Sequence, residues 1–188
     1  PPATCYEFIN LLIESGLPAG FCQMINTDDH SITEIFIKDD IIAFFSFIGS
    51  SKVGWKLKSK LSAGTKCALE HGGIASVIID KDTNIKEVMP SIVRGAFYHA
   101  GQVCVSIQKV IVHEEIADEF LNLMSQSIKK LKVGDPSKNT TDVGPLIRPG
   151  ELERIHKLIQ KSIKNGAELV CGGKAKSKTT YELSLIHI

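Results

Sequence analysis

The residues best suited to covalent chemistry are one cysteine and one glutamate, each placed beside glycine. Cys104 follows a predicted helix and the loop Gly101-Gln102-Val103, and it precedes a predicted strand. A free thiol ionises near pH ~8.5, so a nucleophilic cysteine needs help from local amides, a cation or a base. Because inert buried thiols are far commoner than nucleophiles, Cys104 indicates catalysis only if a base lies nearby.

Glu70 is the candidate base. It ends a short predicted strand and is followed by His71, Gly72 and Gly73. The glycines leave room for another group beside the carboxylate, and a carboxylate in a partly enclosed place is suited to accept a proton from water. Taken alone, the motif also fits a surface glutamate before a glycine turn.

A turn with glycine at each end is the candidate site for an anionic ligand. In the segment FIGSSKVG, residues 47–54, a predicted strand ends at Gly49 and a helix begins directly after it. Glycine lets the backbone approach a ligand, and the free amides and dipole of a helix start favour an anion such as a pyrophosphate. Strand-turn-helix packing produces the same pattern, so this turn alone favours a structural role.

Taken together and in this order, FIGSSKVG, EHGG and GQVC closely resemble the coenzyme loop, the base motif and the nucleophile motif of the aldehyde dehydrogenase superfamily. The 34 residues that separate Glu70 from Cys104 also agree with that family's spacing. Three further segments, at residues 14–20, 132–136 and 142–146, resemble family landmarks. The resemblance therefore covers roughly residues 1–182.

The resemblance implies a reaction and a set of site residues. Cys104 as thiolate would attack a small-molecule aldehyde, and Glu70 would activate the water that hydrolyses the resulting thioester, with NAD or NADP as coenzyme. The implied coenzyme-binding residues are Gly49, Ser50, Val53 and Gly54. The family also implies a homodimer or homotetramer for the complete protein.

Three alternatives stay open at this point. An acylating member of the family would deliver the thioester to coenzyme A, although Glu70 favours hydrolysis. A non-catalytic remnant that binds nucleotide or a partner is the alternative from a different class. A cysteine hydrolase has little support, because no histidine has a spacing that identifies it as the partner of Cys104.

The elements that must position these residues alternate between strand and helix. Predicted strands cover residues 21–25, 41–48, 66–70, 75–79 and 105–113, and predicted helices cover residues 4–15, 32–37, 50–61, 84–98, 116–131 and 152–164. The continuous apolar run at residues 41–48 is typical of a strand buried on both faces. Trp55 and Phe97 are expected to be core aromatics. The pattern predicts an α/β fold with a mainly parallel sheet.

The expected organisation combines a Rossmann-like coenzyme-binding portion with part of an α/β catalytic domain of the aldehyde dehydrogenase type. Residues 1–72 would form the C-terminal part of the coenzyme-binding domain, and residues 73–182 the N-terminal part of the catalytic domain. Residues 183–188 continue no pattern and are expected to be a non-native tail. We expect an internal fragment that is inactive in isolation, since the family's oxyanion asparagine and coenzyme lysine would lie upstream of Pro1.

The composition of the chain argues against several classes of function, among them nucleic-acid binding and membrane association. With 43% hydrophobic and 23% charged residues, the chain has the balance of a soluble globular protein. The 22 basic and 21 acidic residues are dispersed, which argues against a nucleic-acid partner. No apolar run approaches the ~20 residues that span a bilayer, so no membrane partner and a cytoplasmic location are expected. The five cysteines form no CxxC pair, which argues against a disulfide framework and against a metal site.

Overall fold

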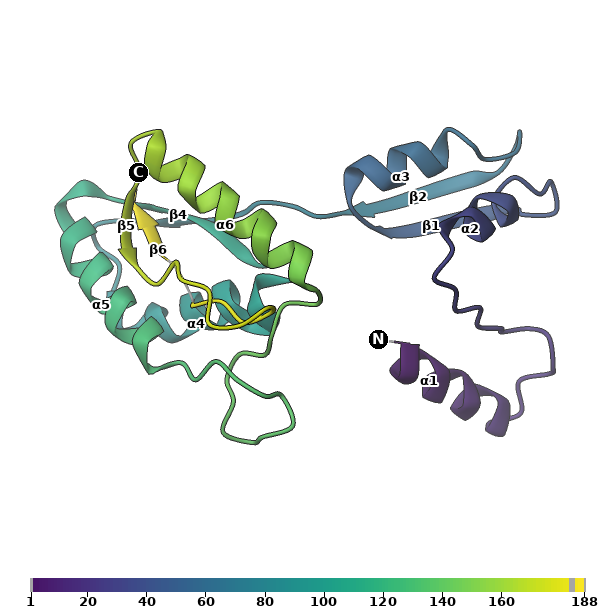
Figure 1. Ribbon diagram of the computed structural model, residues 1–188, viewed down its shortest axis with the longest axis horizontal. Coiled ribbons are helices and arrows are strands. Elements are labelled where there is room, and N and C mark those ends of the chain that lie inside the picture. Colours follow the sequence, from purple (N-terminus) through teal and green to yellow (C-terminus); the bar gives the residue numbers. More distant parts are fainter. Residues whose placement is uncertain (1, 183–184, 188) are drawn as a thin grey trace. The chain divides into compact units, whose positions relative to one another are not determined.

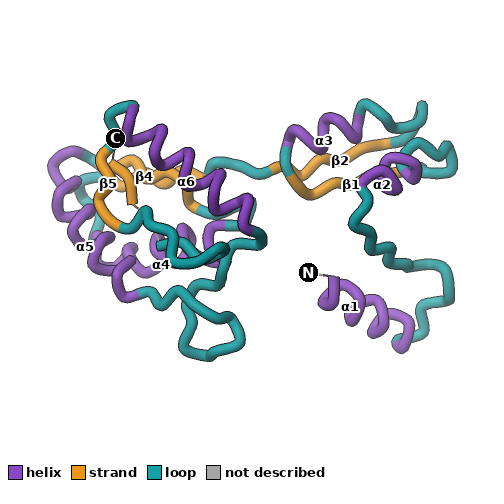
Figure 2. The backbone as a smooth tube through the Cα atoms, in the orientation of Figure 1, coloured by secondary structure: helices purple, strands orange, loops and turns teal. Residues whose placement is uncertain are grey.

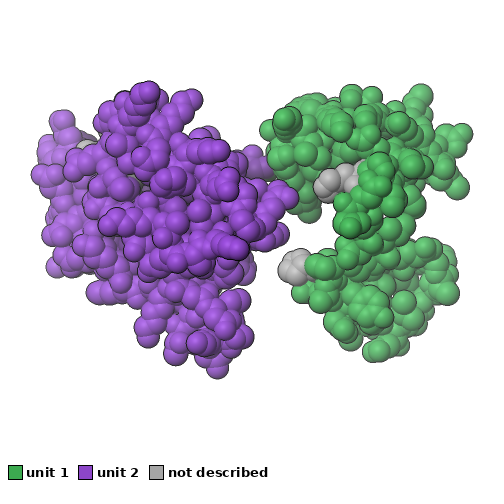
Figure 3. Space-filling model, in the orientation of Figure 1, with its two compact units in different colours: residues 1–71 green, residues 72–188 purple. Residues whose placement is uncertain are grey.

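The chain forms two compact units, residues 1–71 and 72–188, which Figure 3 colours separately. The computed structural model describes residues 2–182 and 185–187. The division between the units falls within the EHGG segment, adjacent to the boundary that the sequence predicts. The assignment of each unit to a domain of a longer protein stays a prediction.

The first unit contains two parallel strands and three helices (Figure 1). Its elements are α1 (Pro2–Glu14), α2 (His30–Phe36), β1 (Phe44–Gly49), α3 (Ser51–Lys58) and β2 (Lys66–His71). The register of the strand pair runs from Phe44 opposite Lys66 to Gly49 opposite His71. Parallel strands place their carboxyl ends at the same edge, so Gly49 and the end of β2 lie together.

The two faces of this strand pair differ in burial. Along β1, half-buried Phe45 and Phe47 alternate with exposed Phe44 and Ile48, as expected for side chains that alternate between faces. Helix α3 packs on the half-buried face, where Gly54 approaches Phe47. The expectation that this strand is buried on both faces was wrong, since Ile48 is 80% exposed. An apolar run favours burial, but burial also needs a second layer, and α3 covers one face.

The predicted strand at residues 21–25 was also wrong. These residues form bends and irregular chain in the connection between α1 and α2 (Figure 2), and Phe21 is 78% exposed. A strand requires a partner for its backbone hydrogen bonds, which an apolar pattern cannot guarantee. Trp55 is likewise no core residue, because it is 58% exposed on α3.

The second unit holds the larger apolar core. Its elements are β3 (Ala75–Ile79), α4 (Ile85–Phe97), η1 (Tyr98–Gly101), β4 (Ile107–Val112), η2 (Glu114–Ile116), α5 (Ala117–Lys130), α6 (Pro149–Lys164), β5 (Glu168–Cys171) and β6 (Leu185–His187). Strands β3 and β4 are parallel, whereas β5 and β6 are antiparallel. Of the predicted tail, residues 183, 184 and 188 lie outside the described residues.

The core of the second unit forms between α4, α5 and the β3–β4 pair. Its buried members are Ile79, Ile85, Met89, Ile92, Val93, Phe120, Met124 and Ile128. Gly95 permits close contact between α4 and β4, because a Cβ atom at this position would lie 2.6 Å from Cδ1 of Ile107. Phe97 packs at the margin of this core, as expected. Within the described residues, no helix is long and apolar enough to cross a membrane.

The connection between α5 and α6 is a closed loop. Asp142 accepts a hydrogen bond from the Lys132 amide over 2.8 Å, and Val133 pairs with Val143 in a single parallel bridge. Val143 is buried, at 3% exposure. The segments at 132–136 and 142–146, which the sequence singled out separately, therefore lie side by side.

Candidate active site

The candidate anion site is the turn between β1 and α3. Gly49 is the last residue of β1, and Ser50 caps α3 in an extended conformation, with its Oγ accepting a hydrogen bond from the Val53 amide over 3.4 Å. The first turn of α3 contains no acidic residue, and Val53 is 44% exposed. The helix dipole at this end is thus free of a competing carboxylate from the first turn.

Gly54 is buried, unlike the other candidate coenzyme-binding residues Gly49, Ser50 and Val53. A Cβ atom at this position would collide with Nε2 of His71 and would lie 3.0 Å from Cδ1 of Phe47. The His71 ring also makes an edge contact with Trp55 at a centroid separation of 5.8 Å. Gly54 is therefore the position at which α3 and β2 approach each other, which the glycine pattern alone did not reveal.

Glu70 lies at the carboxyl end of β2, beside the anion turn. It is exposed and pairs with Ile48, while His71 pairs with Gly49. Because consecutive strand residues face opposite sides, the inward contact of His71 with α3 directs Glu70 to the open face. The structure thus places Glu70, Gly49 and Ser50 at one edge of the first unit.

Cys104 occupies the corner of a tight turn in the second unit. The amide of Ser106 donates a hydrogen bond to the Val103 carbonyl over 3.1 Å, which closes a turn with Cys104 and Val105 at its centre. Cys104 is exposed, whereas Ser106 is 2% exposed. Cys104 therefore lies at the exposed corner of a turn whose last residue, Ser106, is buried.

Gly73 is a contact of Cys104 that sequence reasoning missed. A Cβ atom at Gly73 would lie 3.4 Å from the carbonyl oxygen of Cys104, and the Gln108 amide group donates to the Gly73 carbonyl over 2.9 Å. The last glycine of EHGG thus lies against the nucleophile turn. Only the repeated glycine hinted at such an approach.

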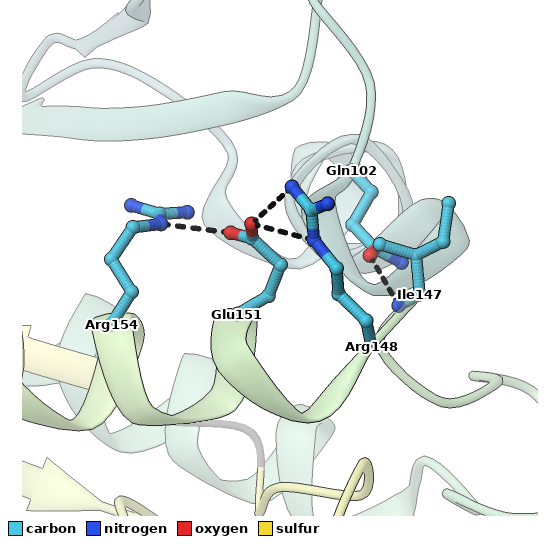
Figure 4. A network of polar contacts seen from close by, with 5 residues as sticks. All are labelled: Gln102, Ile147, Arg148, Glu151 and Arg154. Atoms are coloured by element: carbon cyan, nitrogen blue, oxygen red, sulfur yellow. Dashed lines mark hydrogen bonds and ion pairs between the residues drawn. The ribbon is translucent and has the colours of Figure 1, made fainter. Parts of the chain in front are cut away.

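Gln102 is the second residue that was missed. Its Oε1 accepts a hydrogen bond from the Ile147 amide over 2.9 Å (Figure 4). Its Nε2 donates to the Pro145 carbonyl over 3.4 Å. These partners are 45 and 43 residues away in the chain. Since no local pattern announces such a pairing, the sequence provided no signal for it.

The other candidate functional residues, namely metal-ligating groups, the remaining cysteines and His99, have no comparable setting. Among the described residues, no group of three or more His, Cys, Asp or Glu side chains could hold a metal ion. The cysteines are free thiols, and Cys5 shares the exposure of Cys104 without a comparable setting. His99 is exposed and its ring contacts that of Tyr98 in a tilted arrangement, with 4.0 Å between the ring centroids and 49° between the ring planes.

The sequence profile of the aldehyde dehydrogenase family matches residues 1–184. The chain belongs to this family. Its aldehyde dehydrogenase motifs occupy the carboxyl end of β2, the start of α3 and the turn at Cys104. The predicted α/β fold of the aldehyde dehydrogenase type is confirmed by solved structures of the family that resemble the chain over almost its whole length.

Individual aldehyde dehydrogenases are similar to the chain in sequence and in structure. A lactaldehyde dehydrogenase from Methanococcus aeolicus is 38% identical over 88% of this chain and 35% of its own length. The structure of glyceraldehyde-3-phosphate dehydrogenase GapN from Methanocaldococcus jannaschii complexed with NADP has a TM-score of 0.91 and 32% identity, over 100% of this chain and 41% of that one. An NAD-dependent aldehyde dehydrogenase from Sinorhizobium meliloti has a TM-score of 0.93 and 26% identity, over 98% and 37% respectively. The chain thus spans less than half the length of these proteins.

Proposed function

We propose that the protein to which this chain belongs oxidises a small-molecule aldehyde to a carboxylate with NAD or NADP. The observation that carries this proposal is the setting of Cys104, an exposed thiol at the corner of a hydrogen-bonded turn. Family membership and the contact between Gly73 and Cys104 support it.

The strand-turn-helix at Gly49 and Ser50 is suited to a dinucleotide. The amides at the start of α3 would bind the pyrophosphate, and exposed Val53 would lie along the ligand. Gly54 would act indirectly, by allowing α3 to lie close to His71. When bound, the oxidised nicotinamide supplies the hydride acceptor for the reaction. The named coenzymes of the two solved relatives, NADP and NAD, support this choice of cofactor.

Cys104 would act as the nucleophile. Its thiolate forms a bond to the carbonyl carbon, and the electrons of the carbonyl double bond move to oxygen. The Ser106 amide donates the hydrogen bond that closes the turn, and the Cys104 amide would donate to that developing oxyanion. Loss of hydride converts the thiohemiacetal to a thioester.

Glu70 would act as the base that completes the cycle. It takes a proton from water, and the resulting hydroxide attacks the thioester carbon. The carbon–sulfur bond then breaks to release the Cys104 thiolate and the carboxylic acid, which loses its proton to water and becomes the carboxylate. The exposed position of Glu70 at the end of β2 leaves its carboxylate open to water.

Cys104→Ser in the complete protein tests the nucleophile. We expect aldehyde oxidation to fall by at least ~1000-fold with coenzyme binding unchanged, because a serine hydroxyl is far less acidic and less nucleophilic than a cysteine thiol. The rate follows from absorbance of the reduced coenzyme. Cys5→Ser, at another exposed cysteine, is the control and should retain full activity. Substantial turnover by the Cys104→Ser protein would overturn the assignment.

Glu70→Gln tests the base. We expect the first burst of reduced coenzyme to persist while steady-state turnover falls by ~100-fold or more, since removal of a general base slows hydrolysis and not thiolate attack. Stopped-flow absorbance separates the two phases. The matched control is Glu14→Gln, an exposed glutamate of the same unit. An unaltered steady-state rate would exclude Glu70 as the base.

The substrate class and the assembly are also proposals. Lactaldehyde and glyceraldehyde 3-phosphate, the substrates that two relatives are named for, are the first aldehydes to assay. We expect a cytoplasmic homodimer or homotetramer that needs neither nucleic acid nor membrane. Size-exclusion chromatography with light scattering would measure the oligomeric state.

A further inference from the structure

Gln102 connects two segments of the second unit that lie far apart in the sequence. On one side, its carbonyl group accepts from the Ile147 amide over 2.9 Å, and its amide group lies 3.4 Å from the Pro145 oxygen. On the other side, its amide group donates to the His99 carbonyl over 3.0 Å. The same side chain therefore fastens the segment before Cys104 to the segment before α6.

The backbone immediately before Gln102 is one that needs support. His99 and Ala100 have φ angles of 49° and 58°, and Gly101 follows at 71°. Left-handed backbone is unfavourable for residues with a Cβ atom and persists where neighbouring contacts hold it in place. The backbone amide of Gln102 also donates to the His99 carbonyl, over 3.2 Å, so this residue closes the left-handed turn twice.

The far end of the connection is itself anchored. Leu146 is buried and its amide donates to the Thr179 carbonyl over 2.8 Å. Beyond Ile147, the carboxylate of Glu151 accepts from Arg148 over 3.1 Å and from Arg154 over 2.8 Å (Figure 4). These contacts hold the start of α6, so Gln102 is fastened to a fixed segment.

We propose that Gln102 is a positioning residue for Cys104, an inference that rests on the proposed function of Cys104 as nucleophile. One residue, Val103, separates them, and the Val103 carbonyl is the acceptor that closes the Cys104 turn. A displacement of Gln102 therefore moves the first residue of that turn. The hydrogen bonds of Gln102 hold the thiol at a fixed place between the left-handed turn and the segment at 145–147.

The amide side chain is required because it both accepts and donates. Methionine has similar length and flexibility but makes neither contact. Glutamate keeps the acceptor for the Ile147 amide, but its ionised form would face the carbonyl oxygens of His99 and Pro145 without a donor. His99 supplies the carbonyl acceptor for Gln102, and Arg148 and Glu151 form their ion pair near Gln102 (Figure 4).

The experiment compares Gln102→Met, Gln102→Glu and the control Gln126→Met in the complete protein. Gln126 donates to Asn122 within α5, so its replacement also removes one side-chain hydrogen bond. The readouts are kcat, the Kd for coenzyme, and the rate at which iodoacetamide alkylates Cys104, followed by mass spectrometry of its peptide.

For Gln102→Met we expect kcat to fall by about 10- to 100-fold, as misplacement of a reacting group by about 1 Å can cause, with coenzyme Kd within about twofold. The alkylation rate of Cys104 should also change, and Gln126→Met should leave all three readouts unaltered. The deficit of Gln102→Glu should shrink as pH is lowered, because a protonated carboxyl regains one donor, whereas that of Gln102→Met should stay constant relative to wild type.

Three outcomes decide the matter. Near-normal kcat and alkylation in Gln102→Met would overturn the inference. Parallel losses of kcat and coenzyme affinity in both variants would also overturn it, because Gln102 would then support the fold in general. Activity of Cys104→Ser in the same assay would instead refute the proposed function, which keeps the two failures distinct.

Discussion

At the scale of single residues, Gly54 and His71 form a complementary pair. The absent side chain of Gly54 leaves the space that the His71 ring occupies, and Nε2 of His71 is buried without a hydrogen-bond partner among the described residues. The contact sets the separation between α3 and β2. It therefore links the helix of the proposed anion site to β2, the strand that carries Glu70.

Gly54→Ala should lower the free energy of unfolding by about 1–2 kcal/mol. Overpacking costs about 1–3 kcal/mol and exceeds the ~1 kcal/mol that alanine contributes in a helix. In a His71→Ala background the same substitution should cost at least ~1 kcal/mol less. Urea unfolding of the four proteins measures this coupling. Gly150→Ala, where a Cβ atom meets nothing within 4 Å, should show no coupling to His71. Additive effects for Gly54 would refute the pair.

At the scale of elements, Glu34 joins α2 to the end of α3. Its Oε1 lies 2.7 Å from Nζ of Lys56, and its Oε2 pairs with Lys60. The hydrogen bond from Lys56, followed by that from Lys60, lowers the pKa of Glu34 to about 2 from its usual 4.5. A carboxyl with a lowered pKa stabilises the fold above its unfolded pKa and loses this contribution as the pH falls through the folded one.

Glu34→Gln should therefore destabilise the first unit at neutral pH and not near pH 2. The difference from wild type should be constant above the unfolded pKa of 4.5 and should vanish as the pH falls to about 2. Trp55, the only tryptophan of the 188 residues, reports urea unfolding by its fluorescence. Glu7→Gln, an exposed glutamate on α1, provides the comparison. A difference that persists at pH 2 would show that Glu34 acts through packing and not through charge.

At the scale of the whole molecule, the larger cluster of buried apolar residues lies in the second unit, between α4, α5 and the β3–β4 pair. Phe120, at 2% exposure, lies in this core. Phe120→Ala should cost about 3–5 kcal/mol and lower hydrogen-exchange protection throughout residues 75–131, because the elements that share this cluster are expected to unfold cooperatively. Leu158→Ala, at a side chain that is 52% exposed, should have little effect. Loss of protection confined to α5 would contradict a single cooperative core.

Several features were predictable from local patterns. Apolar residues at helical spacing identified α4, α5 and α6 to within a few residues, since each helix needs one apolar stripe. The strand at 21–25 was predicted wrongly, because its apolar residues find no partner strand among the described residues. An apolar pattern shows which side chains favour burial, but the elements that would cover them or pair with them are set by the rest of the fold.

The sequence by itself determined the family and the identity of the candidate nucleophile and base, because the types and spacing of Cys104, Glu70 and their glycines are local properties of the chain. Only the tertiary structure decided which neighbours hold these residues. The packing of His71 on Gly54 and the hydrogen bonds of Gln102 to the segment at 145–147 join residues distant in sequence. Such pairings arise when the core brings elements together, and no spacing along the chain encodes them.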